Sequence, residues 1–328
     1  MNRLTSFLRN YLGDVGVVFY ISLLIITAFV TTAALQPEAV EATAQKVLDA
    51  TAKNVGWMYL MATTGFVLFV LFLAFSKFGS LRLGQDNEPP EFSFTSWLAM
   101  IFSGGMGVGL VFWGVAEPIM HLNDPPLGLA EPRSVEAAQL GMRYAFFHWG
   151  FHQWANFTLV GLAIAYVRFR HNSHGLISET FRPLLGDRVD RSWGKMIDIL
   201  AVVSTLFGVA TTLGLGALQV NSGLARLGVA EYSVTSQFMI LGGLATLFTI
   251  SAMTPLDKGI RYLSNVNLLL AAGLLIFVLV MGPTAFIFGE LTQTVGEYLG
   301  NLIEMSMVTT PYSDEKWVEQ WTMFYWAW

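Results

Sequence analysis

The stretch Ser103-Gly104-Gly105-Met106-Gly107-Val108-Gly109-Leu110-Val111-Phe112-Trp113-Gly114-Val115-Ala116-Glu117-Pro118 decides the fold of this chain. Four of its first seven residues are glycine, and each glycine lowers helix propensity by about 1 kcal/mol relative to alanine. The surrounding uncharged run, Phe92 to Ala116, is long enough to cross a bilayer. Because lipid cannot replace lost backbone hydrogen bonds, an interrupted helix persists in a membrane where its bared amides and carbonyls line a protein-enclosed site. We predict such an interruption here; the alternative is that the glycines only allow close helix packing.

The composition indicates an all-α polytopic membrane protein. Of 328 residues, 54% are hydrophobic and only 12% are charged, whereas a soluble domain carries about 25% charged residues. The formal net charge of -5 gives no reason to expect a nucleic-acid partner. The absence of cysteine excludes disulfides, iron–sulfur clusters and thiolate zinc sites.

Six further uncharged runs are long enough to span a bilayer: Val15–Leu35, Val55–Ser76, Tyr144–Val167, Ile199–Ala225, Tyr232–Leu256 and Tyr262–Gly289. The first is too long for the apolar core of a signal peptide, so we expect it to remain as a membrane helix. Placing the N-terminus in the cytoplasm puts most of the 18 lysines and arginines on the cytoplasmic side. The positive-inside rule therefore predicts a cytoplasmic N-terminus.

Three features delimit these runs. Glu117-Pro118 is expected to end the glycine-containing helix. Glu290–Met307 has apolar residues at helical spacing and glutamates on another face, which predicts an amphipathic helix on the outer surface or an ordinary loop helix packed on the protein. Nine uncharged residues follow Glu319, about 14 Å of helix. We therefore expect Trp328 to lie inside an eighth helix that is cut short.

Aromatic residues gather between Phe146 and Phe157. On a continuous helix, Trp149, Trp154 and Phe157 would lie within an arc of about 140°. They would form one wall of a cage for a quaternary ammonium group, which has no N–H to satisfy and is attracted by aromatic faces. The alternative is an aromatic belt at the membrane interface.

Two other patterns concern metal ions. His148 and His152 are four residues apart, but zinc needs further ligands, and neither an HExxH motif nor a nearby carboxylate or cysteine supplies them in sequence. We predict histidines hydrogen-bonded within the helical bundle. Between Ser204 and Gly216, hydroxyls and glycines recur; they either ease helix packing or supply oxygen ligands to a small hard cation.

Taken together, several motifs resemble the betaine/carnitine/choline transporter family. They occur in the family's order across nearly the whole chain: Gly105-Met106-Gly107-Val108-Gly109 with Ala116-Glu117-Pro118, His148-Trp149 with Trp154, Gly214–Gln219, Gly259–Asn265 and Trp321–Trp328.

The resemblance implies a LeuT-like inverted-repeat fold in a multi-pass protein of the cell (inner) membrane, usually a homotrimer of twelve-helix subunits. Residues 1–91 would hold the N-terminal tail and two peripheral helices, and 92–289 a complete first repeat. Residues 290–315 would hold the extracytoplasmic amphipathic helix and loop, and 316–328 the truncated start of the eighth helix and of the second repeat.

The resemblance also implies roles for individual residues. The substrate-binding positions would be Gly105, Met106, Gly107, Gly109, Trp149, Trp154, Phe157, Trp326 and Trp328. The sodium positions would be Ser103, Met106 and Thr205. Three positions are informative. Phe157 lacks the hydroxyl of the family's usual tyrosine, Val209 lacks the hydroxyl that accompanies Thr205, and Gly109 stands where choline-selective members often carry aspartate.

The implied function is sodium-driven uptake of a quaternary-ammonium compatible solute such as glycine betaine, with sodium as coupling ion and no other cofactor. Carriers of carnitine, choline, ectoine or dimethylsulfoniopropionate are alternatives, as is a non-transporting osmosensor. An intramembrane enzyme is not expected, because no nucleophile or metal constellation is assembled in the sequence.

Overall fold

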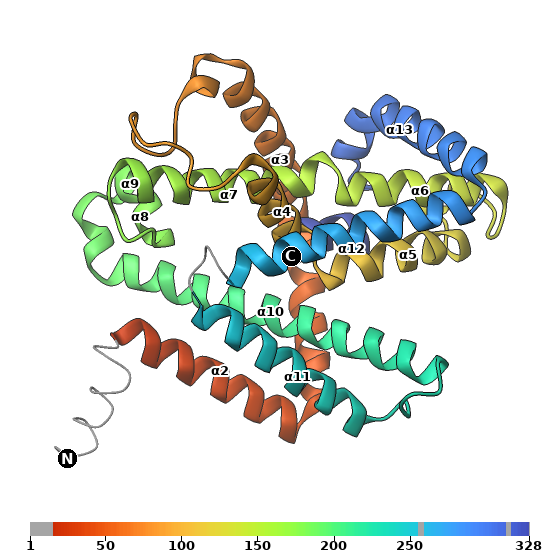
Figure 1. The fold of residues 1–328 in the computed structure, drawn as a ribbon, viewed down its shortest axis with the longest axis horizontal. Helices are drawn as coiled ribbons and strands as arrows, with labels where there is room; N and C mark the ends of the chain where they lie inside the picture. The colour runs from red at the N-terminus through yellow and green to blue at the C-terminus, as the bar shows by residue number, and fades with distance from the viewer. Residues whose placement is uncertain (1–15, 255–258, 313–315, 328) are drawn as a thin grey trace. The chain divides into compact units, whose positions relative to one another are not determined.

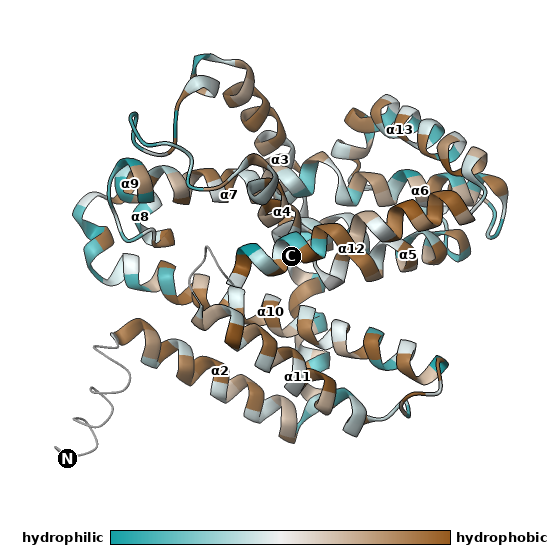
Figure 2. Ribbon diagram, viewed as in Figure 1, coloured by the Kyte–Doolittle hydropathy of each residue, from teal (hydrophilic) through white to brown (hydrophobic). Residues whose placement is uncertain are grey.

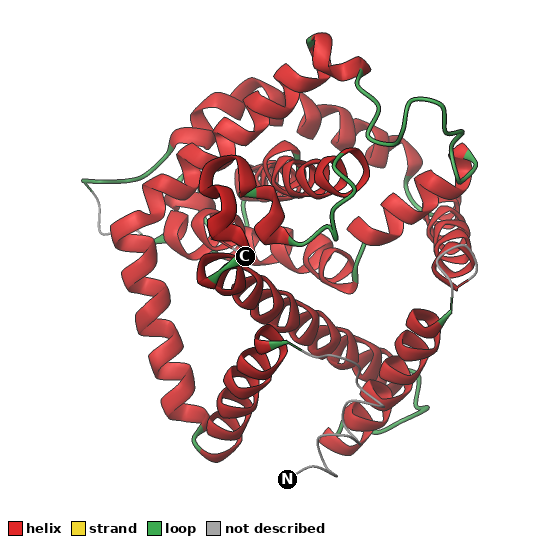
Figure 3. Cartoon of the chain, turned by 90° about the vertical axis from the view of Figure 1, so that its left-hand side faces the viewer, coloured by secondary structure: helices red, strands yellow, loops and turns green. Residues whose placement is uncertain are grey.

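The computed structural model describes residues 16–254, 259–312 and 316–327, and in this part of the chain it contains only helices and loops (Figure 3). The chain divides into two compact units. The first comprises Met1–Glu88, Gln153–Gly208 and Met323–Trp328, and the second comprises Pro89–His152 and Val209–Thr322. Figure 1 labels the helices of both units.

Long apolar helices make this a multi-pass membrane protein. Five described helices are long and apolar enough to cross a bilayer: α2 (Val17–Leu35), α3 (Pro37–Phe75), α10 (Ser192–Arg226), α11 (Val234–Met253) and α12 (Gly259–Met281). A bent pair over Phe94–Gly105 and Gly109–Gly128 raises this number to six if it is one span. Hydrophobic residues run along most of α2 and α11 (Figure 2).

In the first unit, α2 packs against α3, and Phe29 meets Phe207 of α10 edge to face with ring centroids 4.6 Å apart. The polar stretch after Leu35 is helical, so α3 is longer than the apolar run that predicted it. Proline at the first position of α3 favours this start, because its missing N–H would have no helical partner there.

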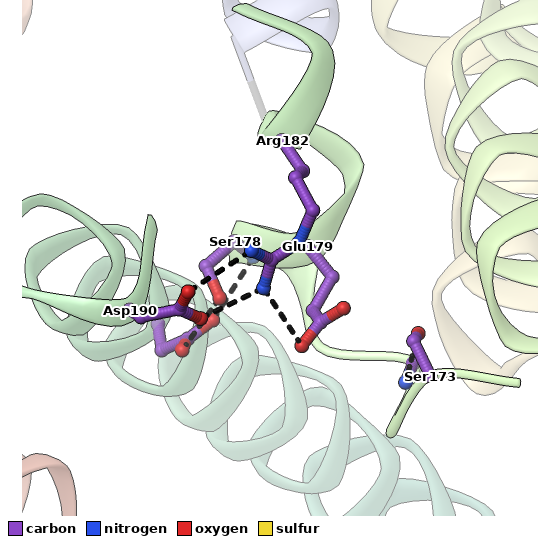
Figure 4. A network of polar contacts seen from close by, with 7 residues as sticks. Ser173, Ser178, Glu179, Arg182 and Asp190 are labelled. Atoms are coloured by element: carbon purple, nitrogen blue, oxygen red, sulfur yellow. Dashed lines mark hydrogen bonds and ion pairs between the residues drawn. The ribbon is translucent and has the colours of Figure 1, made fainter. Parts of the chain in front are cut away.

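A polar loop between α7 (Phe151–Arg170) and α10 is held by paired charges (Figure 4). Arg182, at the start of the short helix α9 (Arg182–Leu185), donates two hydrogen bonds of 2.8 and 3.0 Å to Asp190. These bonds lower the pKa of the Asp190 carboxyl. In α8 (Ile177–Thr180), the backbone N–H and hydroxyl of Ser178 donate to Asp198 of α10.

The second unit contains the glycine-rich stretch. Helix α4 (Phe94–Gly105) packs on α12, and α5 (Val108–Asn123) packs on α6 (Val135–Trp149). The contact between α5 and α6 is close at Gly141, where an added Cβ would lie 3.1 Å from both Cβ of His121 and the carbonyl oxygen of Pro118.

The expectation that Glu117-Pro118 ends this helix is wrong, because α5 continues through Pro118 to Asn123. Proline removes one backbone hydrogen bond and its ring crowds the carbonyl four residues earlier. That carbonyl belongs to Gly114, which brings no side chain of its own. The charge of Glu117 is not exposed to lipid either, since its carboxylate is fully buried among hydrogen-bond donors.

The fourth apolar run is two helices rather than one. Helix α6 ends at Trp149, Gly150 has φ -92° and ψ -140°, and α7 begins at Phe151. The hydroxyl of Tyr298 accepts a hydrogen bond of 3.0 Å from the Phe151 N–H, and a Cβ on Gly150 would lie 2.6 Å from that hydroxyl. Burial raises the pKa of Tyr298. The absent side chain of Gly150 thus lets a tyrosine occupy the break.

Tyr298 belongs to α13 (Thr284–Met307), which confirms the helix predicted over Glu290–Met307. The helix begins earlier than expected, directly after Gly282-Pro283, and it packs on α6. Proline disfavours helical geometry in the residue before it, which separates α13 from α12.

The tight contact at Gly141 yields a stability prediction. Gly141→Val should lower the free energy of unfolding by about 1–3 kcal/mol, because the added methyl groups have no space between α5 and α6. The measurement is thermal unfolding of the purified protein in detergent. Gly161→Val on α7, where a Cβ meets no atom of its own unit within 4 Å, is the matched control. Equal effects of the two substitutions would contradict the prediction.

Candidate functional site

The candidate site begins at the predicted interruption, which the structure confirms. Helix α4 ends at Gly105, Met106 has φ -91° and ψ 68°, and Gly107 is extended with φ -79° and ψ 175° before α5 starts. The segments Phe94–Gly105 and Gly109–Gly128 are inclined at 54° to each other. Neither Met106 nor Gly107 needs a positive φ, so glycine acts here by its poor helix propensity rather than by permitting left-handed backbone.

Helix α12 secures the last turn of α4. The Ser103 hydroxyl donates to the carbonyl oxygen of Ser264 at 3.4 Å and accepts from the Asn267 side-chain amide at 3.1 Å. This secures one predicted sodium ligand, Ser103, three residues before another, Met106. The third, Thr205, lies in the other unit, where it is exposed and its hydroxyl donates to the carbonyl of Ala201 at 2.8 Å.

Beyond the interruption, α5 carries a buried carboxylate on which ring nitrogens converge. Oε1 of Glu117 lies 2.6 Å from Nδ1 of His148 and 3.3 Å from Nε2 of His121. Oε2 of Glu117 accepts from the Trp149 indole N–H at 2.9 Å. Nε2 of His148 lies 2.9 Å from the hydroxyl of Thr322. We call these five residues the Glu117 cluster.

Aromatic rings surround the two histidines of the Glu117 cluster. The imidazole of His148 stacks on Trp317 with centroids 5.8 Å apart and 24° between planes. The imidazole of His121 meets Trp321 edge to face at 4.4 Å. Trp317 also contacts Tyr144 at 4.7 Å. These rings keep lipid and water from the carboxylate, which is 0% exposed.

Three residues of the Glu117 cluster have the composition of a metal site: Glu117, His121 and His148 offer ligand atoms within 4.8 Å of one another. Ligands on one zinc ion lie about 2.0–2.2 Å from the metal, which separates them from each other by about 3 Å or more. The 2.6 Å between Glu117 and His148 is shorter and matches a charge-assisted hydrogen bond. Hydrogen bonding therefore accounts for the geometry of these three side chains.

The prediction that the histidines are hydrogen-bonded within the bundle is confirmed for both. His148 contacts Glu117 and Thr322, and His152 contacts the hydroxyl of Ser306 at 3.0 Å. The expectation that no carboxylate lies near these histidines is wrong, because Glu117 contacts His148 from 31 positions earlier in the chain.

The predicted aromatic wall does not lie on one helix. Trp149 is the last residue of α6 in the second unit, whereas Trp154 and Phe157 lie on α7 in the first. The arc of about 140° assumed a continuous helix and is wrong, because α6 ends before Gly150. Trp154 and Phe157 still contact each other, with ring centroids 5.9 Å apart.

The first unit contains a cavity of about 530 Å³ between α3, α7 and the short helix α14 (Phe324–Ala327). Phe157 and Trp326 line it, so two of the predicted substrate positions share one cavity. Gln153 and Asn156 add polar atoms to its wall, and their side-chain oxygens have no hydrogen-bond partner among the described residues. Trp328 lies outside the described residues.

The remaining predicted positions follow the interruption itself. Gly105 is the last residue of α4, Met106 and Gly107 form the link, and Gly109 is buried in the first turn of α5. Glu117, His121 and Thr322 are not among the site residues predicted from the sequence. The spacing of Glu117 and His121, four residues apart on one helix, was the one local signal.

Comparison with known proteins agrees with the motifs. A family model described as the betaine/carnitine/choline family transporter matches residues 17–328. The chain is 44% identical over 311 residues to an ectoine/hydroxyectoine transporter of Virgibacillus pantothenticus, covering 95% of this chain and 62% of that protein. It is 44% identical over 320 residues to the glycine betaine transporter OpuD of Bacillus subtilis, covering 97% and 62% respectively. The chain thus spans less than two thirds of the length of these relatives.

The contact between His148 and Thr322 can be tested by removing the hydroxyl. Thr322→Val should lower the free energy of unfolding by about 1–3 kcal/mol, because it takes a hydrogen-bond partner from a buried imidazole while preserving shape. Thr322→Ser keeps the hydroxyl and should be less destabilising. Thermal unfolding in detergent measures both, and a valine variant as stable as the wild type would contradict the contact.

Proposed function

This chain belongs to the betaine/carnitine/choline transporter family, and from that premise we propose that the protein is a sodium-coupled carrier that accumulates a quaternary-ammonium zwitterion such as glycine betaine. The observation that carries the proposal is the interruption at Met106-Gly107 in a unit that also contains the Trp149 indole. Discontinuous helices are where many secondary carriers bind substrate and ions.

The two ends of glycine betaine match two kinds of group on this chain. Its trimethylammonium end has no N–H, so aromatic faces suit it better than hydrogen-bond acceptors. Trp149, in the unit that contains the interruption, is the proposed wall, and the resemblance assigns Trp154 and Phe157 the same role. Its carboxylate suits the free backbone N–H groups at the start of α5, a helix of 16 residues whose N-terminal end carries a partial positive charge. A zwitterion therefore needs no acidic side chain at Gly109.

The proposed coupling ion is sodium. The Ser103 hydroxyl and the backbone carbonyls freed around Met106 are hard oxygen donors next to the interruption. Thr205 is the proposed member of a second sodium position. An inward sodium ion releases about 2.3 kcal/mol per 100 mV of membrane potential. Sodium binding would stabilise the interrupted helix and so favour the substrate-binding conformation.

The proposed architecture follows the family. Residues 92–289 form the first inverted repeat, the chain lies in the cell membrane with its N-terminus in the cytoplasm, and three copies assemble. The positive-inside distribution of lysine and arginine supports the orientation.

Ectoine is the second candidate substrate, because a relative named for it is as similar to this chain as one named for glycine betaine. Ectoine carries N–H groups that need acceptors, whereas Phe157 offers none. We therefore propose glycine betaine as the better substrate, and competition between the two during uptake distinguishes them.

Sodium coupling has a direct test. Proteoliposomes with an inward sodium gradient should accumulate radiolabelled glycine betaine, and replacing external sodium with potassium should abolish accumulation, because the gradient supplies the work. Collapsing the sodium gradient with an ionophore is the control. Equal uptake in sodium and potassium would overturn the coupling.

The role of Gly109 yields a specificity prediction. Gly109→Asp should weaken glycine betaine uptake and strengthen choline uptake, because a carboxylate repels the substrate's own carboxylate and compensates a cation that lacks one. Gly109→Asn is the matched control, since it adds the same volume without charge. If both variants shift the ratio of choline to betaine uptake equally, charge is not the cause.

A further inference from the structure

We propose that Glu117 is a positioning residue for the substrate cation, acting through the Trp149 indole. Its carboxylate fixes the indole by the N–H and places a negative charge at the edge of the ring whose face attracts the quaternary ammonium. The proposal rests on the carrier function proposed above. It adds to that function a buried anion that does not touch the substrate.

The contact geometry sets the direction of the hydrogen bonds. The indole Nε1 carries a hydrogen and can only donate, so Oε2 of Glu117 is the acceptor at 2.9 Å. Oε1 of Glu117 faces nitrogens of both His148 and His121. An ionised carboxylate accepts at both oxygens, so it satisfies all three contacts when each facing ring nitrogen carries its hydrogen. We take this ionised form as the basis of the proposal.

The surroundings fix this carboxylate in place. Glu117, His121 and His148 are each 0% exposed. Thr322 lies against the far nitrogen of His148, at 2.9 Å, and so orients that ring toward Glu117. Such a network costs much to rearrange in a low-dielectric interior. The indole of Trp149 is thereby attached to a rigid part of the second unit.

A carboxylate on the indole N–H has two effects on a bound cation. It limits rotation of the ring, because turning the indole would break a charge-assisted hydrogen bond in a buried position. It also adds the field of a full negative charge to the ring quadrupole, and this field is poorly screened away from water. The first effect helps any ligand that packs on the ring, and the second favours a cation over a neutral group of the same shape.

The test is a double-mutant cycle on substrate affinity. Glu117→Gln keeps the shape and removes the charge, and it should weaken binding of radiolabelled glycine betaine about tenfold. In a Trp149→Phe background, which has no N–H to hold, the same change should weaken binding by a clearly smaller factor, because only the field of the charge remains to be lost. Glu304→Gln, an exposed carboxylate on α13, is the matched control for lost charge. Equal losses in both backgrounds would show that Glu117 acts on the unit in general and would overturn the proposal.

A second ligand separates charge from shape. In 3,3-dimethylbutanoate a tert-butyl group replaces the trimethylammonium group of glycine betaine, so the cation is lost and the outline is kept. Glu117→Gln should weaken binding of 3,3-dimethylbutanoate, measured by its competition with betaine, by a clearly smaller factor than it weakens binding of betaine. A tenfold loss for both ligands would indicate a purely structural effect and would also overturn the proposal.

A ligand-free measurement keeps this proposal distinct from the carrier function. In protein labelled with ¹⁵N-tryptophan, the Trp149 indole resonance is the one lost in Trp149→Phe, and it should move when Glu117→Gln is introduced. An unmoved resonance would overturn the positioning role whatever the substrate is. Failure of the wild type to bind any quaternary ammonium would instead overturn the carrier function, and with it the effect on affinity.

If Glu117→Gln does not fold, benzothienylalanine in place of Trp149 supplies the second variant. It keeps the fused ring and replaces the N–H with sulfur, while Glu117 is unchanged. Betaine binding should weaken about fivefold, and binding at wild-type strength would contradict the proposal.

Discussion

The structure depends on satisfying the backbone of a membrane helix where it is interrupted. In lipid, a bared amide or carbonyl costs several kcal/mol unless protein supplies a partner. The Met106-Gly107 link is therefore held from both sides. Ser103 and Asn267 fasten α4 to α12 before the link, and the Glu117 cluster fastens α5 to α6 beyond it. These two attachments leave a short link, whose Met106 N–H donates to the carbonyl of Phe102 and whose Gly107 carbonyl accepts from the N–H of Val111.

Local composition predicted the fold where a single segment decides the outcome. The uncharged runs became helices, and the glycines after Ser103 became an interruption, because propensity and hydropathy act within a few residues. The errors lie where distant parts of the chain decide. Pro118 remains inside a helix beside Glu117, whose carboxylate is hydrogen-bonded by groups on α6. Gly150 ends a helix where the Tyr298 hydroxyl occupies the position of a side chain.

For the candidate site too, the sequence predicted what local motifs mark and missed the contacts between distant parts of the chain. Resemblance to known motifs selected Trp149, but no pattern along the chain could show that its N–H meets Glu117, which lies 32 positions away. His148 and His152 suggested a pair by spacing, and the structure gives them different partners on different segments. Buried polar networks join residues by their position in space, so their members carry little signal in a single sequence.

The turn that contains Thr322 has a consequence for the aromatic residues around it. Residues Glu319–Met323 form a π-helical turn, which holds one more residue per turn than an α-helix. The wider turn offsets the residues after it by one position around the helix axis. Trp321 and Thr322 contact the two histidines, and Trp326 lines the cavity of the first unit. A one-residue insertion or deletion in this turn would change which rings face the buried imidazoles.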